Sequence, residues 1–100
     1  MQAMMFRARV RAERVADVEA SVRRLFSAIE RERPKGIRYA SCRLADGVTY
    51  VILLQLTQGT DNPLEALPEF QQFQEGLRSQ LAEPPTQEQL TVVGSYGLFE

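Results

Sequence analysis

Residues 48–57, VTYVILLQLT, are rich in β-branched and aromatic side chains, which is typical of a strand. Successive side chains of a strand point to opposite sides of its sheet. Tyr50, Ile52 and Leu54 therefore lie on one side, and Val51 and Leu53 lie on the other. A strand with one side in water should alternate apolar and polar residues, and this run does not. We expect both faces of this strand to be covered.

The dipeptide Asp46-Gly47 precedes this run and predicts a two-residue hairpin turn that joins it to a strand at 37–44. This turn predicts four cross-strand pairs: Arg43 with Tyr50, Ser41 with Ile52, Tyr39 with Leu54, and Ile37 with Leu56. The eight side chains share one face of the hairpin, so two tyrosines, a serine and an arginine are expected on the same side.

Two helices and two further strands complete the pattern. Apolar residues spaced three and four apart predict a helix over about 13–33, which Pro34 and Gly36 end. After a polar turn at 58–62, a second stripe predicts a short turn at 63–67, capped by Asn62, and a main helix from Pro68. Strands are expected at 4–10 and 89–99.

The order β-α-β-β-α-β predicts an α+β fold of the ferredoxin-like class, as a single domain over residues 1–100. With right-handed crossovers, the four strands form an antiparallel sheet in the spatial order 4-1-3-2, with both helices on one face. The helices leave the other face of the sheet uncovered. Each large aliphatic side chain left there forgoes roughly 1.5–3 kcal/mol of burial. We therefore expect a homodimer whose two sheets pack face to face as a dimeric α/β barrel.

The composition argues against several classes of partner and cofactor. The chain has 12 basic and 13 acidic residues, so we expect no nucleic acid and no anionic membrane as its main partner. No apolar run approaches the roughly 18 residues of a membrane helix. The absence of histidine and the single Cys42 argue against a metal or haem centre, and we expect no cofactor. A lone cysteine favours a reducing, cytoplasmic location.

The chain resembles the dimeric α/β-barrel proteins of the antibiotic-biosynthesis-monooxygenase type. The resemblance is carried by YVILLQLT at 50–57 and LPEFQQFQEGL at 67–77, and it covers most of residues 4–99. It implies the ferredoxin-like fold, a homodimer, and a family that includes cofactor-independent monooxygenases of aromatic compounds. The chain departs from the family where a histidine commonly precedes the residue that corresponds to Phe70, because Glu69 stands there.

The candidate ligand-binding residues are Tyr39, Ser41, Arg43, Tyr50 and Arg7. A tyrosine hydroxyl and a guanidinium can hold a phenolate or a carboxylate and stabilise its anion. Arg7 and its strand neighbour Arg9 can face the dimer cavity and favour anions there. As an alternative, the tyrosines pack at the dimer interface, Arg43 is solvated, and the arginines of the first strand pair with acids of the second copy.

Two functions remain open from the sequence, and no residue is assigned a catalytic role. The first is an enzyme that binds and oxidises a small aromatic or acidic metabolite without a cofactor, as in monooxygenases of the resembled family. The alternative is a non-catalytic small-molecule-binding or dimeric interaction protein. A third class, the RNA-recognition module, shares the topology, but VILLQL at 51–56 lacks the exposed aromatic and basic residues that such a module needs.

Overall fold

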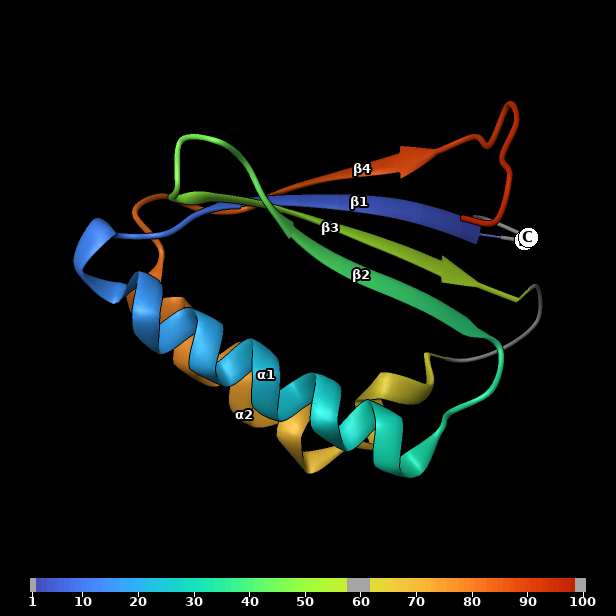
Figure 1. The fold of residues 1–100 in the computed structure, drawn as a ribbon, viewed down its shortest axis with the longest axis horizontal. Coiled ribbons are helices and arrows are strands. Elements are labelled where there is room, and N and C mark those ends of the chain that lie inside the picture. Colours follow the sequence, from blue (N-terminus) through green and yellow to red (C-terminus); the bar gives the residue numbers. More distant parts are fainter. Residues whose placement is uncertain (1, 58–61, 99–100) are drawn as a thin grey trace.

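A four-stranded antiparallel sheet carries two helices on one of its faces (Figure 1). The strands are β1 (Gln2–Arg9), β2 (Ile37–Arg43), β3 (Thr49–Leu56) and β4 (Thr86–Leu90), and the helices are α1 (Val15–Glu32) and α2 (Pro68–Gln80). The computed structural model describes residues 2–57 and 62–98. The sheet order is β2-β3-β1-β4, so the predicted ferredoxin-like class and strand order are confirmed.

The β2–β3 hairpin has the predicted register, with Arg43 opposite Tyr50 and the other three pairs as expected. Its loop is longer than the predicted two residues. The backbone N–H of Leu44 donates to the carbonyl of Thr49 at 2.8 Å, so residues 45–48 form the turn. The Asp46 carboxylate accepts hydrogen bonds from the backbone of Val48 and Thr49 at 2.9 and 2.8 Å. These bonds hold a four-residue loop, and Gly47 supplies its positive φ of 80°.

The helices begin and end close to the predicted positions. A 3-10 turn, η1 (Ala12–Arg14), leads into α1, which ends at Arg33 in the left-handed conformation with φ 46°. The predicted short turn is η2 (Pro63–Ala66), and the Asn62 side chain accepts a hydrogen bond from the Leu64 N–H at 3.0 Å. The predicted cap is therefore confirmed, while the rest of the polar turn at 58–61 lies outside the described residues.

The last strand was predicted wrongly at 89–99, because β4 spans Thr86–Leu90. β4 pairs only with β1, and that ladder ends where Leu90 lies opposite Ala3, close to the start of β1. Residues 91–98 therefore form no strand in the described part of the chain, although they include apolar residues, and the predicted end at Phe99 lies outside the described residues. The true strand, TQEQL, is polar because it is an exposed edge strand.

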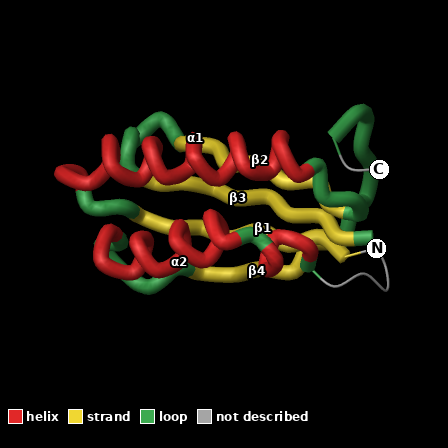
Figure 2. Tube along the Cα trace, turned by 90° about the horizontal axis from the view of Figure 1, so that it is seen from below, coloured by secondary structure: helices red, strands yellow, loops and turns green. Residues whose placement is uncertain are grey.

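The helices cover the face of the sheet that carries Tyr39 and Tyr50. Tyr39 and Leu54 belong to a core cluster around Leu64, and Tyr50 packs in a second cluster with Val10 and Val18. Figure 2 shows α1 over β2 and β3, and α2 over β1 and β4. Between residues 2–57 and 62–98, no helix is long and apolar enough to cross a membrane.

The opposite face, which we call the open face, carries no helix (Figure 1). Because β1 places Phe6 in the core, Arg7 and Arg9 lie on the open face, beside Val51 and Thr49 of β3. At the end where β1 begins, the segment after β4 crosses this face toward β2 (Figures 1 and 2). Ala3 and Gln55 are buried at that end. The remainder of the open face is uncovered in the single chain.

Candidate functional site

Three of the predicted ligand-binding residues, Ser41, Arg43 and Tyr50, line one cleft between α1 and the edge strand β2. The cleft has a volume of about 360 Å³. From α1 it is lined by Glu19, Val22 and Arg23. Pockets for small molecules begin at roughly 300 Å³. The cleft is therefore large enough for a ligand of one or two rings.

The Glu19 carboxylate lines this cleft and accepts hydrogen bonds from Tyr50 and Arg43. The Tyr50 hydroxyl donates to Oε2 of Glu19 at 2.7 Å, and Nη1 of Arg43 donates to the same oxygen at 2.6 Å. Nη2 of Arg23 lies 3.7 Å from Oε1. A carboxylate, a phenol and a guanidinium thus converge where α1 crosses the β2–β3 hairpin.

Glu19 was not among the residues predicted from the sequence. This residue directly follows Val18, which is in the core, and precedes Arg23 by one helical turn. A carboxylate at the flank of a buried helical stripe was the available signal. Sequence alone could not show which strand residue it would meet, because that depends on where α1 crosses the sheet.

The cleft holds a charged carboxylate and a neutral phenol at neutral pH. The hydrogen bond from Tyr50 is the largest of the effects that lower the pKa of Glu19 below 4.5, and the charges of Arg43 and Arg23 act in the same direction. Burial, followed by the hydrogen bond to Glu19, raises the pKa of Tyr50 above 10. Chemically, Glu19 is a strong hydrogen-bond acceptor and a weak base.

Tyr39 lies apart from this cleft. Its ring stacks on Phe26 with ring centroids 5.3 Å apart and 15° between the planes. Burial raises the pKa of Tyr39 to about 12. The alternative that Tyr39 and Tyr50 pack at a sheet-to-sheet interface is wrong, because both face the helices of their own chain.

Arg7, the fifth predicted residue, is on the open face and cannot act with the other four. It lines a separate cleft of about 400 Å³ together with Arg9, Thr86 and the acidic residues Asp46 and Glu83. Arg7 and Arg9 were predicted to share a face, and their alternation along β1 places them there.

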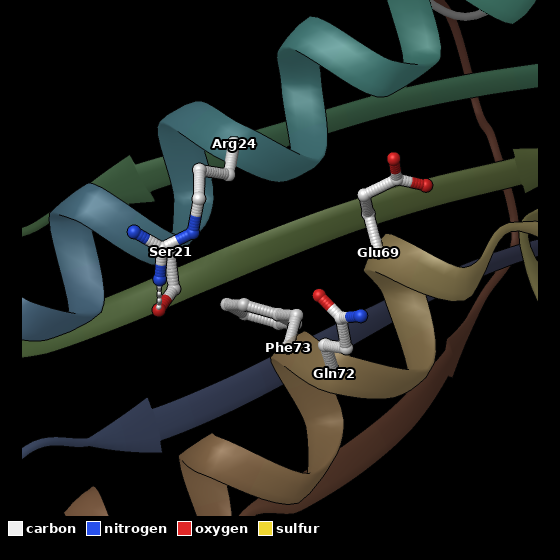
Figure 3. Close-up of a pocket in the computed structure, with 5 residues that line it drawn as sticks. All are labelled: Ser21, Arg24, Glu69, Gln72 and Phe73. Atoms are coloured by element: carbon white, nitrogen blue, oxygen red, sulfur yellow. Dashed lines mark hydrogen bonds between the residues drawn. The ribbon is translucent and has the colours of Figure 1, made fainter.

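A third, smaller pocket lies between the two helices (Figure 3). Its volume is about 40 Å³, and Ser21, Arg24, Glu69, Gln72 and Phe73 line it. Arg24 turns toward Ser21 and donates to its hydroxyl at 3.0 Å, while the Glu69 carboxylate points away from Phe73. Oε2 of Glu69 accepts from Arg31 at 3.0 Å, and its buried Oε1 has no partner among the described residues. The pocket has room for water but not for a metabolite.

No group of three or more Asp, Glu or Cys side chains in residues 2–57 and 62–98 is placed to hold a metal ion. The cleft at Glu19 offers one carboxylate, and two arginines already lie against it. Its donor set therefore suits an organic ligand with hydrogen-bonding groups.

Comparison with known proteins supports the fold assignment. Neither a protein-family model nor a curated protein matches this sequence. Among solved structures, a Nitrosomonas europaea protein described as an antibiotic biosynthesis monooxygenase has a TM-score of 0.79 at 15% identity, and the alignment covers 94% of this chain and 100% of the other. A Caulobacter crescentus protein of the same description has a TM-score of 0.74 at 19% identity, with 93% and 90% covered.

A third similar structure is SnoaB, a cofactor-independent oxygenase from Streptomyces nogalater. Its TM-score is 0.70 at 18% identity, and the alignment covers 96% of each chain. These likenesses span nearly the whole chain, so they concern the fold as a whole. At the level of the fold they confirm the predicted resemblance: the chain has the ferredoxin-like architecture of the antibiotic-biosynthesis-monooxygenase-like proteins.

Proposed function

We propose that this protein binds a small hydroxylated aromatic metabolite in the cleft between α1 and β2. The observation that carries the proposal is the convergence of Tyr50 and Arg43 on Glu19 inside a cleft of about 360 Å³. Glu19 already accepts from both donors, so a carboxylate ligand would have to displace it. A phenolic hydroxyl can instead donate to the Glu19 carboxylate, and Val22 gives the ring an apolar contact. A phenol is therefore the ligand class that the cleft suits best.

The proposed reaction, where the ligand is also a substrate, is oxygenation without a cofactor. The support is the likeness to SnoaB, which is a cofactor-independent oxygenase. In such a reaction the substrate supplies all four electrons that reduce O2: a CH2 group and O2 give a C=O group and water. Glu19 would hold the phenolic hydrogen and increase electron density in the ring, while Arg43 would lie beside the developing anion.

The alternative, binding without chemistry, is favoured by the lowered pKa of Glu19. A carboxylate held by a phenol and two arginines is a weak base, and cofactor-free oxygenation begins with removal of a proton from the substrate. Tyr50 is neutral and donates its hydrogen to Glu19, so it offers no second base. The two functions share one site and differ only in whether O2 is consumed.

The binding proposal is tested by thermal shift with 1-naphthol, using naphthalene as the ligand without a hydroxyl. A ligand at 100 times its Kd stabilises the folded protein by about 2.7 kcal/mol. We expect 1-naphthol to raise Tm, and Glu19→Gln and Tyr50→Phe to weaken this effect. Glu30→Gln, an exposed position on α1 away from the cleft, is the control. The absence of a shift, or an equal loss in the control, would contradict the site.

The reaction is tested by following dissolved O2 with the phenols that bind. Oxygen uptake that depends on an intact Glu19–Tyr50 pair supports an oxygenase. Binding without uptake identifies the protein as a non-catalytic binder.

We further propose that two copies pack through their open faces as a dimeric α/β barrel, in a cytoplasmic setting. The support is a group of partly exposed apolar side chains on the open face, which includes Met5, Val51 and Leu53. Val93 and Tyr96 of the segment after β4 are 98% and 102% exposed in the single chain, and a second copy could cover them. Cys42 is exposed and unpaired on the same face, which suits a reducing environment.

A further inference from the structure

We propose that the open face holds a second binding site, in which Arg7 and Arg9 bind a phosphate or carboxylate group of a small molecule. The two arginines line a cleft of about 400 Å³. This cleft and the phenol cleft at Glu19 lie on opposite faces of the sheet, so the inference does not depend on the proposed function. The residues that line the cleft at Arg7 all belong to one chain.

The arginines lie on a central strand of the sheet, where charged residues are uncommon. β1 is flanked by β3 and β4. Arg7 lies opposite Val51 on one neighbour and Thr86 on the other, and Arg9 lies opposite Thr49. Unpaired charges are uncommon on a sheet face that also carries apolar side chains. The position therefore indicates a role for the charge.

The guanidinium donors are unused within the described part of the chain. Neither Arg7 nor Arg9 forms an ion pair or a side-chain hydrogen bond with a described residue. Asp46 lies nearby, and the charge of Arg9 contributes to its lowered pKa, but the Asp46 oxygens already accept from the backbone and the hydroxyl of Thr49. Glu83 at the cleft rim and Glu88 of β4 are exposed and form no ion pair with either arginine.

The spacing of the two arginines suits an anionic group. Residues two apart on a strand are separated by roughly 6.8 Å, and each guanidinium presents a planar set of N–H donors. Two such groups can donate hydrogen bonds to one phosphate or carboxylate from both sides. Thr86 adds a hydroxyl at the cleft wall, and Pro84 offers an apolar contact for the rest of the ligand. The acidic rim disfavours long polyanions, so the expected ligand is a small molecule.

The experiment is isothermal titration calorimetry at low ionic strength, with inorganic phosphate and benzoate as the two probes. We expect at least one probe to bind the wild-type chain. Arg7→Gln and Arg9→Gln should each raise its Kd at least about tenfold, which corresponds to about 1.4 kcal/mol. Lys35→Gln removes the same charge from the loop after α1 and should leave the Kd unchanged.

Two results would overturn the proposal. The first is that neither probe binds, or that Lys35→Gln weakens binding as much as Arg7→Gln, since a general charge effect would then explain the data. The second is that the arginines pair with acids of a second copy. In that case Glu88→Gln would weaken dimerisation, as measured by sedimentation. Replacing chloride by phosphate at equal ionic strength would not strengthen dimerisation of the wild-type chain. Glu19→Gln should affect only 1-naphthol binding, so failure at one cleft is distinguishable from failure at the other.

Discussion

At the scale of single residues, Tyr50 and Glu19 each shift the pKa of the other. The folded-state pKa of Glu19 is lowered below 4.5, so its network stabilises the folded state above that value. This contribution is lost as the pH falls through the folded-state pKa, when the carboxylate becomes protonated. The hydrogen bond between α1 and β3 is thus a pH-dependent contact.

We therefore expect the cost of Tyr50→Phe to be largest at pH 7 and to decrease as the pH falls through the lowered pKa of Glu19. Urea unfolding at a series of pH values from 7 downward measures this decrease. Glu19→Gln serves as the control background, in which the cost of Tyr50→Phe should not follow the pH in this way. A cost that stays constant down to the pH of acid unfolding in the wild-type background would contradict the coupling.

The sequence could predict which residues of the candidate site lie together only when they belong to the same hairpin. The hairpin brought Ser41, Arg43 and Tyr50 to one side, as the alternation of a strand requires. Glu19 comes from another element, and its position depends on helix–sheet packing. Tyr39 shares the face with the other three but lies nearer the core, where Phe26 covers it.

At the scale of elements, the hairpin turn depends on Asp46. Hydrogen bonds from the Thr49 side chain, and then from the backbone of Val48 and Thr49, lower the pKa of Asp46 to about 2. Because the ordinary value is 3.8, this carboxylate stabilises the fold above pH 4 and loses its effect as the pH falls through about 2. We expect the stability difference between the wild type and Asp46→Asn, measured by urea unfolding, to shrink from pH 5 to pH 2. Parallel curves over this range would exclude the effect.

The C-terminus of α1 offers a stabilising substitution. Arg33 adopts φ 46°, a left-handed conformation that costs an L-residue roughly 1–2 kcal/mol and glycine little. We expect Arg33→Gly to increase the free energy of unfolding by about 1 kcal/mol in chemical denaturation. Glu30→Gly places glycine inside the same helix and should instead lower it by about 1 kcal/mol. Destabilisation by both would show that the left-handed conformation carries no penalty here.

Elements defined by local chemistry were predicted well. Asp46-Gly47 set the register, Asn62 capped η2, and Pro68 opened α2. β4 was misplaced because its position depends on a non-local partner, β1, which begins at Gln2. Apolar residues after Leu90 favoured a strand locally, but no strand remained for them to join.

At the scale of the whole molecule, the helix layer is held to the sheet by a small set of buried leucines. Leu64 is 0% exposed and packs with Leu54 and Leu67. We expect Leu64→Ala to reduce the free energy of unfolding by about 2–5 kcal/mol, as is usual when a buried leucine leaves a cavity. Leu98→Ala, in the exposed segment after β4, should change it little. Guanidinium denaturation of both variants checks this, and equal effects would place Leu64 outside the core.

The open face provides the prediction for assembly. We expect a homodimer in light scattering at micromolar concentration, and a monomer after Leu53→Glu, because the new carboxylate would be buried between two sheets. Ala16→Glu, on the exposed side of α1, is the matched control and should remain a dimer. A monomeric wild-type protein would exclude the proposed barrel.

The sequence predicted the layers of the molecule but not which side of the sheet the helices cover. β3 is apolar on both sides, so its own pattern could not decide this. The arginines of β1 indicate which side of that strand is the open face. They indicate which side of β3 is open only when it is known that Arg7 pairs with Val51. That register joins strands more than 40 residues apart, and no local signal specifies it.

The sheet order also implies that the two clefts form at different stages of folding. The cleft at Glu19 is built from α1 and the β2–β3 hairpin, which are consecutive along the chain. The cleft at Arg7 includes Thr86, so it needs the ladder in which Ala3 meets Leu90. Closing so long a loop costs more chain entropy and slows the pairing. The phenol cleft is therefore expected to form early during folding, and the anion cleft only when the two ends of the chain have come together.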